Sequence, residues 1–206
     1  DGTMLVGKDS NGEIEVEMVV YEDEFSRLHP QYLGDRILDR GTVLTYKPNF
    51  RETEKYVQSP YMDNRLGVWT ALQVASTLEN GAIVFSTYEE HGGNSVGFCA
   101  RLLWEKHKVR QALIADITWV TDGVKHGGGV AVSIRDKGLP RRKYLDKIIA
   151  LARESKIPFQ LEVESAGGSD GGVLQESDLL IDWCFIGAAE DNVHTPDEKV
   201  FKNDIE

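Results

Sequence analysis

The sequence predicts an α/β fold in which helices cover both faces of a mixed β-sheet, joined to a small β-rich module. Two observations lead to this prediction. From Tyr61 onward, apolar runs typical of buried strands alternate with segments of helical periodicity. Before that point, short β-type runs are separated by turn residues such as Asn11-Gly12 and show no helical period. We therefore expect a β-rich accessory module over residues 1–58 and a larger α/β domain over residues 59–206.

The composition limits the classes of function to consider. The chain has 206 residues with 41% hydrophobic and 28% charged side chains, which is ordinary globular usage. Its formal net charge of -11 would repel phosphate groups, so we expect no nucleic-acid partner and no membrane partner. No apolar run approaches the roughly 20 residues that span a bilayer. Cys99 and Cys184 each lie in an apolar run, and we expect buried, reduced thiols in a cytoplasmic protein.

Three short runs in the first region have β character. Residues 13–20 alternate apolar and polar side chains, and residues 3–6 and 42–46 are further β-type runs. Glycine-containing turns separate the runs. They predict the small β-rich module.

In the second region the elements follow one another in α/β order. Leu66, Trp69, Leu72, Ala75 and Leu78 share one face of a predicted helix. The further elements expected are strands over residues 82–87, 112–117, 130–134, 159–163 and 179–187, and a helix over residues 141–155. Strands that alternate with helices of this length predict a sheet with helices on both faces.

Polar residues stand at the boundaries of these elements, where ligands of α/β sheets usually bind. Asp63 precedes the first helix, and taken alone it is best explained as an N-cap. Glu89 and Glu90 follow the first strand of this region, and Asp116 interrupts an apolar run, where an unpaired charge would be costly. These carboxylates, with His194 after the last strand, indicate a catalytic site for Zn, Mn or Co rather than a structural zinc.

Residues 195–198 (TPDE) have the pattern of a capping box with proline at the first helical position. This pattern predicts a helix that begins directly after His194. A capping box explains Thr195 and Glu198 but assigns no structural role to the imidazole of His194.

Five short motifs follow one another in order between about Tyr61 and Glu198. They are residues 62–67 (MDNRLG), 88–92 (YEEHG), 115–118 (ADIT), 168–170 (GSD) and 193–196 (VHTP). Together they resemble the dinuclear-metal aminopeptidases, the family that includes the glutamyl, deblocking and tetrahedral aminopeptidases. The resemblance implies a zinc-exopeptidase-like fold, peptide substrates that lose their N-terminal residues, and homo-oligomers assembled through the β-rich module.

The resemblance also implies roles for individual residues. Asp63 would bridge two divalent metal ions, with Zn favoured over Co or Mn. Glu90 and His194 would complete the protein ligands of one ion, and Asp116 would bind the other. Glu89 would be the general base that takes a proton from water held by the metals, a division of labour that this chemistry needs.

The chain departs from the family in several places. Asp170 would line the substrate site, in a motif where Ser169 replaces the family's threonine. The family's further histidine ligand, in a His-x-Asp-like motif, has no match before Asp63, and His29 lacks that context. Because the chain begins at Asp1, we expect it to be trimmed at both ends, which leaves the second metal site incomplete. A degenerate member that binds one metal or none is the alternative.

Two other functions fit parts of the sequence. Residues 167–171 (GGSDG) match the nucleophile elbow of serine hydrolases, and Ser169 is followed in order by Asp182 and His194. A metal-poor descendant that serves as a non-catalytic assembly or interaction subunit is the other alternative. Metal content and sensitivity to a chelator distinguish both from a metallo-aminopeptidase.

Overall fold

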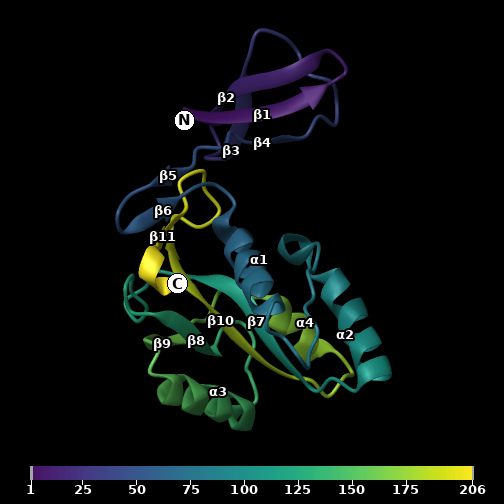
Figure 1. Ribbon diagram of the computed structural model, residues 1–206. Coiled ribbons are helices and arrows are strands. Elements are labelled where there is room, and N and C mark those ends of the chain that lie inside the picture. The colour runs from purple at the N-terminus through teal and green to yellow at the C-terminus, as the bar shows by residue number, and fades with distance from the viewer. Residues whose placement is uncertain (1, 206) are drawn as a thin grey trace.

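The protein is shown as a computed structural model in Figure 1, which describes residues 2–205 except for the side chain of Asn94. Its N-terminal part is a four-stranded antiparallel sheet in the order β3-β2-β1-β4. The strands are β1 (Thr3–Asp9), β2 (Gly12–Glu22), β3 (Leu28–Leu33) and β4 (Leu44–Tyr46). This sheet stands apart from the rest of the molecule in Figure 1, and we call residues 3–46 the small lobe.

Residues 51–205, the large lobe, are built on a seven-stranded mixed sheet. Its strands are β5 (Arg51–Glu52), β6 (Tyr56–Gln58), β7 (Gln111–Trp119), β8 (Val130–Arg135), β9 (Phe159–Val163), β10 (Asp182–Asp191) and β11 (Lys199–Phe201). β10 pairs in parallel with β7 on one edge and antiparallel with β8 and β11 on the other. β8 continues the sheet in parallel with β9, and β11 continues it antiparallel with β6. β5 and β6 thus belong to this sheet, although the division of the chain into domains at residue 58 stays a prediction.

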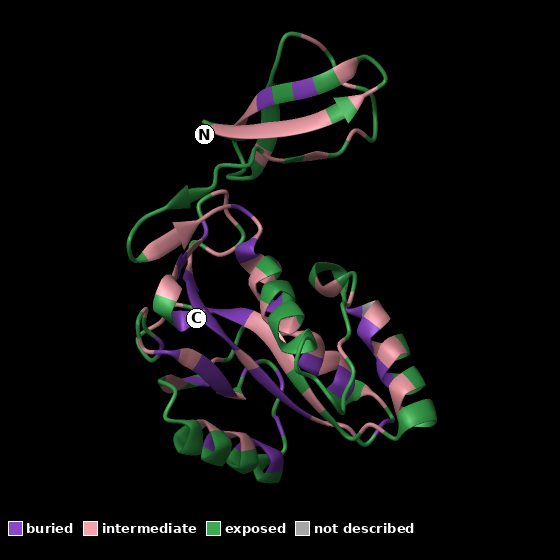
Figure 2. Ribbon diagram, viewed as in Figure 1, coloured by how far each residue is buried: buried purple, intermediate pink, exposed green. Residues whose placement is uncertain are grey.

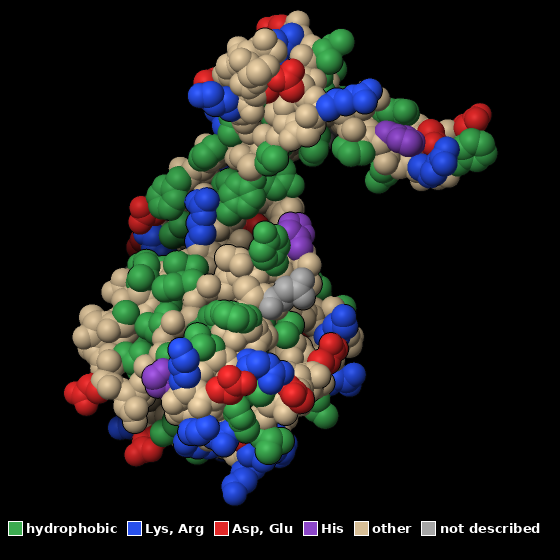
Figure 3. Space-filling model, turned by 90° about the vertical axis from the view of Figure 1, so that its right-hand side faces the viewer, with side chains coloured by type: hydrophobic (Ala, Val, Ile, Leu, Met, Phe, Trp, Pro, Cys, Tyr) green, Lys and Arg blue, Asp and Glu red, His purple; other side chains and the backbone are tan. Residues whose placement is uncertain are grey.

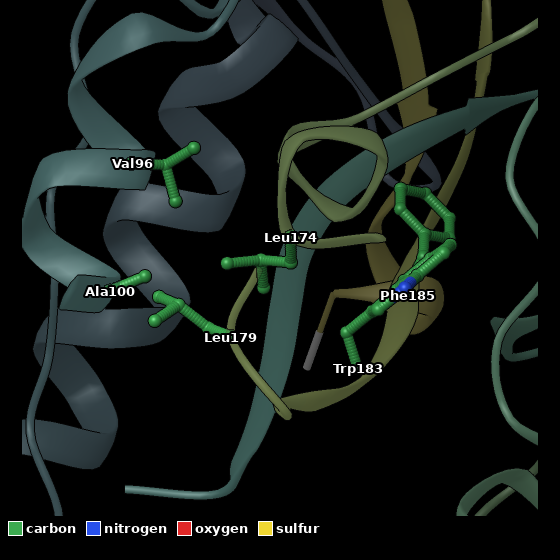
Figure 4. Packing of buried hydrophobic residues seen from close by; sticks show 6 residues of the cluster. All are labelled: Val96, Ala100, Leu174, Leu179, Trp183 and Phe185. Atoms are coloured by element: carbon green, nitrogen blue, oxygen red, sulfur yellow. The ribbon is translucent and has the colours of Figure 1, made fainter. Parts of the chain in front are cut away.

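Helices cover both faces of the large sheet. They are α1 (Met62–Ala75), α2 (Asn94–His107), α3 (Arg142–Ser155) and α4 (Asp170–Glu176). Successive side chains of a strand point to opposite faces. In β10, Trp183 and Phe185 pack with residues of α2 and α4 (Figure 4), whereas Cys184 packs with Tyr144 and Leu145 of α3. The predicted α/β fold, with a mixed sheet between helices, is therefore confirmed.

The two lobes bury very different amounts of apolar surface. In the small lobe as described, Ile14 and Val16 of β2 are the only buried residues, whereas β8 and β10 are buried along most of their length (Figure 2). Burial of one large apolar side chain stabilises a fold by roughly 1.5–3 kcal/mol. The large lobe therefore supplies most of the hydrophobic stabilisation.

Most elements predicted for the large lobe are confirmed. β9 has the predicted bounds, and β7, β8 and α3 contain or closely match the predicted ranges. α1 covers the predicted helix as far as Ala75, and β10 begins at Asp182 rather than at residue 179. In the small lobe, β1, β2 and β4 agree with the predicted runs, and β3 is an additional strand.

The strand predicted over residues 82–87 is wrong. These residues form no strand, and the side chains of Val84 and Phe85 are exposed. An apolar run becomes a strand only where a neighbouring strand pairs with its backbone N–H and C=O groups. No ladder within residues 2–205 includes this run.

Two helices, α2 and α4, were not predicted from the sequence. α2 follows Gly92-Gly93, and Val96, Ala100 and Trp104 recur along it at a spacing of four residues, a signal that could have identified it. α4 has only seven residues, too few for a clear helical period. None of the helices in the described part of the chain has the length and apolar character needed to cross a membrane.

Two glycines allow main chains to approach closely beside β7. A Cβ atom at Gly67 of α1 would lie 2.2 Å from the carbonyl oxygen of Ala115, and one at Gly187 of β10 would lie 2.1 Å from the carbonyl oxygen of Asp116. Both distances are far below ordinary van der Waals contact, so only glycine fits at either position. α1, β7 and β10 therefore come together at the level of Asp116.

The lobes are joined through two tyrosines. The N–H of Tyr46, at the end of β4, donates to Tyr61 Oη at 2.6 Å, and the two rings stack with their centroids 5.8 Å apart. Tyr46 Oη donates to the carbonyl oxygen of His194 at 3.4 Å. The end of the small lobe thus lies against the start of α1 and the turn after β10.

Candidate metal and catalytic site

A cavity of about 260 Å³ lies at the carboxyl end of β7 and is lined mainly by acidic side chains. This is the end of a parallel strand where α/β sheets usually bind their ligands. Of the site residues predicted from the sequence, Asp170 alone is not part of the lining. Among the described lining residues there is no lysine or arginine, and the acids are Asp63, Glu89, Glu90, Asp116, Asp136, Glu162 and Glu164.

Three potential ligand atoms converge on one side of this cavity. His194 Nε2 lies 3.0 Å from Asp63 Oδ2 and 3.3 Å from Glu90 Oε2. The ligand atoms of the three residues all lie within 4.8 Å of one another. They come from the start of α1, from the 3₁₀ turn at Glu89–His91 and from the turn after β10. Two carboxylate oxygens and an imidazole nitrogen are a donor set that suits Zn, Mn or Co.

Asp63 does not cap α1, so its interpretation as an N-cap is wrong. The neighbouring Asn64 makes the cap-like bond, since its Oδ1 accepts the N–H of Gly67 at 2.8 Å. The carboxylate of Asp63 turns instead toward His194. Burial, and then the charge of Glu90, raises the pKa of Asp63 above its ordinary value, although His194 acts in the opposite direction.

Asp116 and Glu89 line the cavity next to this group. Asp116, in β7, accepts the N–H of Ile117 at Oδ1 with a distance of 3.0 Å. Burial, reinforced by the charge of Asp63, raises the pKa of Asp116 to about 8. Burial and the adjacent charge of Glu90 raise the pKa of Glu89 to about 7. In the absence of a cation Asp116 is therefore mostly protonated and Glu89 about half protonated near pH 7, and a bound cation would displace these protons.

The residues after β10 form a tight turn, and the helix predicted there is wrong. Asn192 and His194 have positive φ angles of 59° and 63°, and β11 begins only a few residues later. Thr195 Oγ donates to the carbonyl oxygen of Asn192 at 2.6 Å. Glu198, assigned to a capping box with Thr195, accepts the N–H of His194 instead, at 3.1 Å. The turn, and not a helix, holds the backbone of His194.

Asp170 lies beside the cavity at the start of α4. Its Oδ2 accepts the hydroxyl of Ser86 at 2.5 Å, and burial raises the pKa of Asp170 above its ordinary value. Its Oδ1 is buried and has no hydrogen-bond partner in the part of the chain that the structure describes. The two oxygens thus have different surroundings, one satisfied and one available.

The alternative of a serine hydrolase is wrong, because its residues are not assembled. Ser169 caps α4 through a bond from the N–H of Gly171, and Asp182 pairs with Arg141 at the first residue of β10. His194 follows the other end of that strand. A strand of ten residues spans about 30 Å, so Asp182 is too far from His194 to form the hydrogen bond that a catalytic triad requires.

Two acids at the far end of the cavity were not predicted. Glu162, in β9, is 4% exposed, accepts a hydrogen bond from Thr118 Oγ, and has its pKa raised to about 7 by burial. Asp136 is similarly buried and accepts the N–H of Gly138 at 2.5 Å. An acid inside an apolar strand was the signal that identified Asp116, and it applies equally to Glu162.

A second pair of acids, Glu190 and Glu198, is also buried and was not identified as part of the site. They are 1% and 2% exposed. Burial, and then the charge of Glu198, raises the pKa of Glu190 well above its ordinary value, so Glu190 carries its proton at neutral pH. The large lobe therefore holds acids in its interior as well as around its cavity.

The sequence has recognisable relatives. Residues 33–206 match the family described as M42 glutamyl aminopeptidase. A protein of Acetivibrio thermocellus named as an aminopeptidase is 27% identical over 186 residues, which are 84% of this chain and 51% of that protein. The chain thus spans about half the length of that relative.

Solved structures of two archaeal proteins are similar in fold. The aminopeptidase APDkam598 from Desulfurococcus kamchatkensis has a TM-score of 0.83 and 19% identity, over 99% of this chain and 65% of that one. The TET1 peptidase of Pyrococcus horikoshii, described as able to assemble into a tetrahedron or a large octahedral shell, has a TM-score of 0.75 and 20% identity. That match covers 99% of this chain and 68% of the TET1 chain.

Proposed function

This chain belongs to the M42 glutamyl aminopeptidase family, and from that premise we propose that it is a metal-dependent aminopeptidase that removes N-terminal residues from short peptides. The observation that carries the proposal is the convergence of Asp63, Glu90 and His194 within 4.8 Å. Their donor atoms fit a divalent cation such as Zn, Co or Mn. Their positions in three separate segments make a chance gathering of exposed acids a weaker explanation.

We assign two ions to the site, with Zn favoured. Asp63, Glu90 and His194 would hold one ion, and Asp63 and Asp116 would hold the other. Asp63 and Asp116 line the same cavity, and the charge of Asp63 contributes to the raised pKa of Asp116, which supports this assignment. When bound, such ions act as Lewis acids that polarise a carbonyl group and make a water molecule more acidic.

Glu89 is the proposed general base. It lines the cavity beside Glu90 but offers no atom to the converging group. An ionised carboxylate beside the proposed ligands can take the proton of the attacking water and later give it to the amine that leaves the peptide. The proton moves between a carboxylate oxygen of Glu89 and the leaving nitrogen, so that the base is regenerated in each cycle.

Asp170 is the proposed contact for the substrate. Its Oδ1 lacks a hydrogen-bond partner among residues 2–205 and could accept an N–H group of a peptide. Because this atom is buried and outside the cavity lining, the segment around Asp170 would have to move for that contact to form. The acidic lining of the cavity, with no lysine or arginine among the described residues, favours the positively charged amino end of a peptide.

We also propose that the protein is a cytoplasmic homo-oligomer. The small lobe exposes large apolar side chains, and Figure 3 shows hydrophobic side chains on its surface. Those most exposed in this region are Phe25, Leu28, Leu33, Ile37 and Val43. Apolar surface of this kind favours contact with another protein chain, and the TET1 relative is described as assembling into large shells.

The proposal is tested with this chain by measuring metal content and peptide hydrolysis together. The protein, loaded with Zn or Co, should release the N-terminal residue of a short peptide that has a free amino group. A chelator should abolish the release, and an N-acetylated copy of the peptide should resist cleavage. A folded protein that binds less than about half an equivalent of metal would favour the non-catalytic assembly subunit instead.

A further inference from the structure

The carboxylate of Glu198 connects two segments that are distant in the sequence. It lies between the start of α1 and the turn after β10, which are neighbours in Figure 1. Its Oε2 accepts the N–H groups of Met62 at 2.6 Å and Asp63 at 3.2 Å. Its Oε1 accepts the N–H of His194 at 3.1 Å. The side chain is 2% exposed, so water does not compete for these bonds.

These bonds reach two of the three residues that converge at the candidate metal site. Asp63 and His194 are 131 positions apart in the chain, yet Nε2 of His194 lies 3.0 Å from Oδ2 of Asp63. Glu198 binds the main chain of both residues and leaves both side chains free. It offers no atom to the converging group itself.

We propose that Glu198 is a positioning residue of the metal site, which holds the backbones of Asp63 and His194 at the separation that a shared ion requires. This inference rests on the proposed metal-dependent function. A ligand whose main chain is fixed needs only its side-chain rotamer to be set when the ion binds, so less conformational freedom is lost on binding. Groups that orient metal ligands typically change metal affinity by 10–100-fold when they are removed.

An apolar side chain at this buried position would leave three backbone N–H groups without these acceptors, which is costly. A carboxylate differs from an apolar group because it has two acceptor oxygens with fixed directions. In Glu198 one oxygen serves the segment of Asp63 and the other serves the segment of His194.

The chain contains a matched carboxylate away from the site. Asp204 is 7% exposed and also divides its oxygens between two backbone N–H groups, those of Gly127 at 2.7 Å and Gly129 at 2.9 Å. Asp204 belongs neither to the described cavity lining nor to the converging residues. Asp204→Asn therefore reproduces the loss of a buried carboxylate without touching the proposed ligands.

The experiment compares metal binding by the wild-type chain, Glu198→Gln and Asp204→Asn. In Gln, an NH₂ group replaces one of the two acceptor oxygens and cannot accept a hydrogen bond. The variant therefore loses the bonds either to the segment of Asp63 or to the N–H of His194. We expect the affinity for Zn, measured by competition with a chromogenic chelator, to fall by about 10–100-fold in Glu198→Gln. The visible absorption spectrum of bound Co should also change, because it reports the geometry of the ligands. Asp204→Asn should retain wild-type affinity and the wild-type Co spectrum.

Circular dichroism and melting curves show whether each variant is folded. A folded Glu198→Gln with wild-type Zn affinity and an unchanged Co spectrum would overturn the inference and leave the proposed function intact. Equal losses of affinity in Glu198→Gln and Asp204→Asn would also overturn it, because a general loosening of the core would then be the cause. A wild-type chain that binds no metal would overturn the proposed function as well. If Glu198→Gln does not fold, Glu198→Asp, which keeps the charge but is shorter by one methylene, is judged by the same criteria.

Discussion

Two acids of the small lobe and the acids that line the cavity have opposite surroundings. In the small lobe, Asp9 accepts two bonds from the guanidinium of Arg36, and Asp23 is bonded by His29 and Arg27. These partners hold the pKa of Asp9 and of Asp23 below the ordinary value.

In the large lobe, burial and neighbouring negative charges raise the pKa of Glu89, Asp116 and Glu162, and no lysine or arginine is found in the described lining of their cavity. Carboxylates with cationic partners inside the chain contribute to structure. Carboxylates that are gathered without such partners leave a place for a cation or a proton from outside. The following predictions test this difference, from the largest expected effect to the smallest.

The strongest test is the replacement of Glu89. If Glu89 is the general base, Glu89→Gln should retain its metal while the rate of peptide hydrolysis falls by about 10²–10⁴-fold. Glu90→Gln is the matched control, since the adjacent carboxylate is a proposed ligand and its loss should weaken metal binding. Metal analysis and initial rates on both variants decide the assignment. Loss of metal from Glu89→Gln but not from Glu90→Gln would show that the two roles are reversed.

Replacement of a histidine should affect metal binding in the large lobe but not in the small lobe. His194→Ala should bind Zn at least about 10²-fold more weakly, a larger effect than the loss of an orienting group. Its circular dichroism should stay unchanged, because Glu198 bonds to the backbone N–H of residue 194, which alanine retains. His29→Ala, which removes the partner of Asp23 in the small lobe, should leave metal content unchanged. Wild-type metal content in a folded His194→Ala would refute the ligand assignment.

The pH dependence of stability should have opposite signs in the two lobes. Glu162 has a pKa of about 7 in the folded protein, against an ordinary value of 4.5. A raised pKa stabilises the fold fully below pH 4.5, and this contribution is lost as the pH rises through about 7. In metal-free protein, the free energy of unfolding of Glu162→Gln relative to wild type should therefore increase by up to about 3 kcal/mol between pH 4 and pH 8.

Denaturant unfolding at several pH values measures this change. Glu164→Gln, in the same cavity lining, is the control for the loss of a carboxyl group beside the cavity. A constant difference between Glu162→Gln and wild type across this range would contradict the burial of an ionisable Glu162.

The smallest effect is expected from Arg36→Met in the small lobe. Removal of one ion pair should lower the melting temperature by no more than about 4 °C and leave Zn affinity unchanged. Because the pKa of Asp9 is lowered by Arg36, the contribution of the pair is present above the ordinary pKa of 3.8 and is lost as the pH falls below it. The difference in melting temperature between Arg36→Met and wild type should therefore shrink in acid. A change in metal affinity would show that the lobes are not separate in the way described.

The elements predicted correctly from the sequence are those with a clear apolar run or a clear helical periodicity. In β7, β8, β9 and α3 the apolar run or the helical face has one interpretation. The run over residues 82–87 has the same composition, but its structure depends on a neighbouring strand, which composition does not reveal. The small lobe, with few buried residues, gave weaker patterns, and β3 was overlooked there.

The candidate site was predicted in part for a similar reason. Asp63, Glu89, Glu90, Asp116 and His194 were chosen because they stand at element boundaries and in ordered motifs, and the structure places all of them around one cavity. The roles assigned to them stay predictions. Residues 195–198 were misassigned because a capping box and a carboxylate that binds two distant segments use the same side chains. The choice between them depends on the positive φ of His194, which the sequence pattern does not determine.

Gly67 and Gly187 determine how closely the main chains of α1 and β10 approach the main chain of β7. Beside β7, both face a carbonyl oxygen, so a methyl group at either position would have to move whole segments apart by about 1 Å to reach ordinary contact. Metal–oxygen distances in proteins vary by only about 0.2 Å. The absence of a methyl group at Gly67 therefore sets the separation between the segments that carry Asp63 and Asp116. Its absence at Gly187 sets the separation between β7, which carries Asp116, and β10, which leads to His194. No rotation of a side chain can substitute for either.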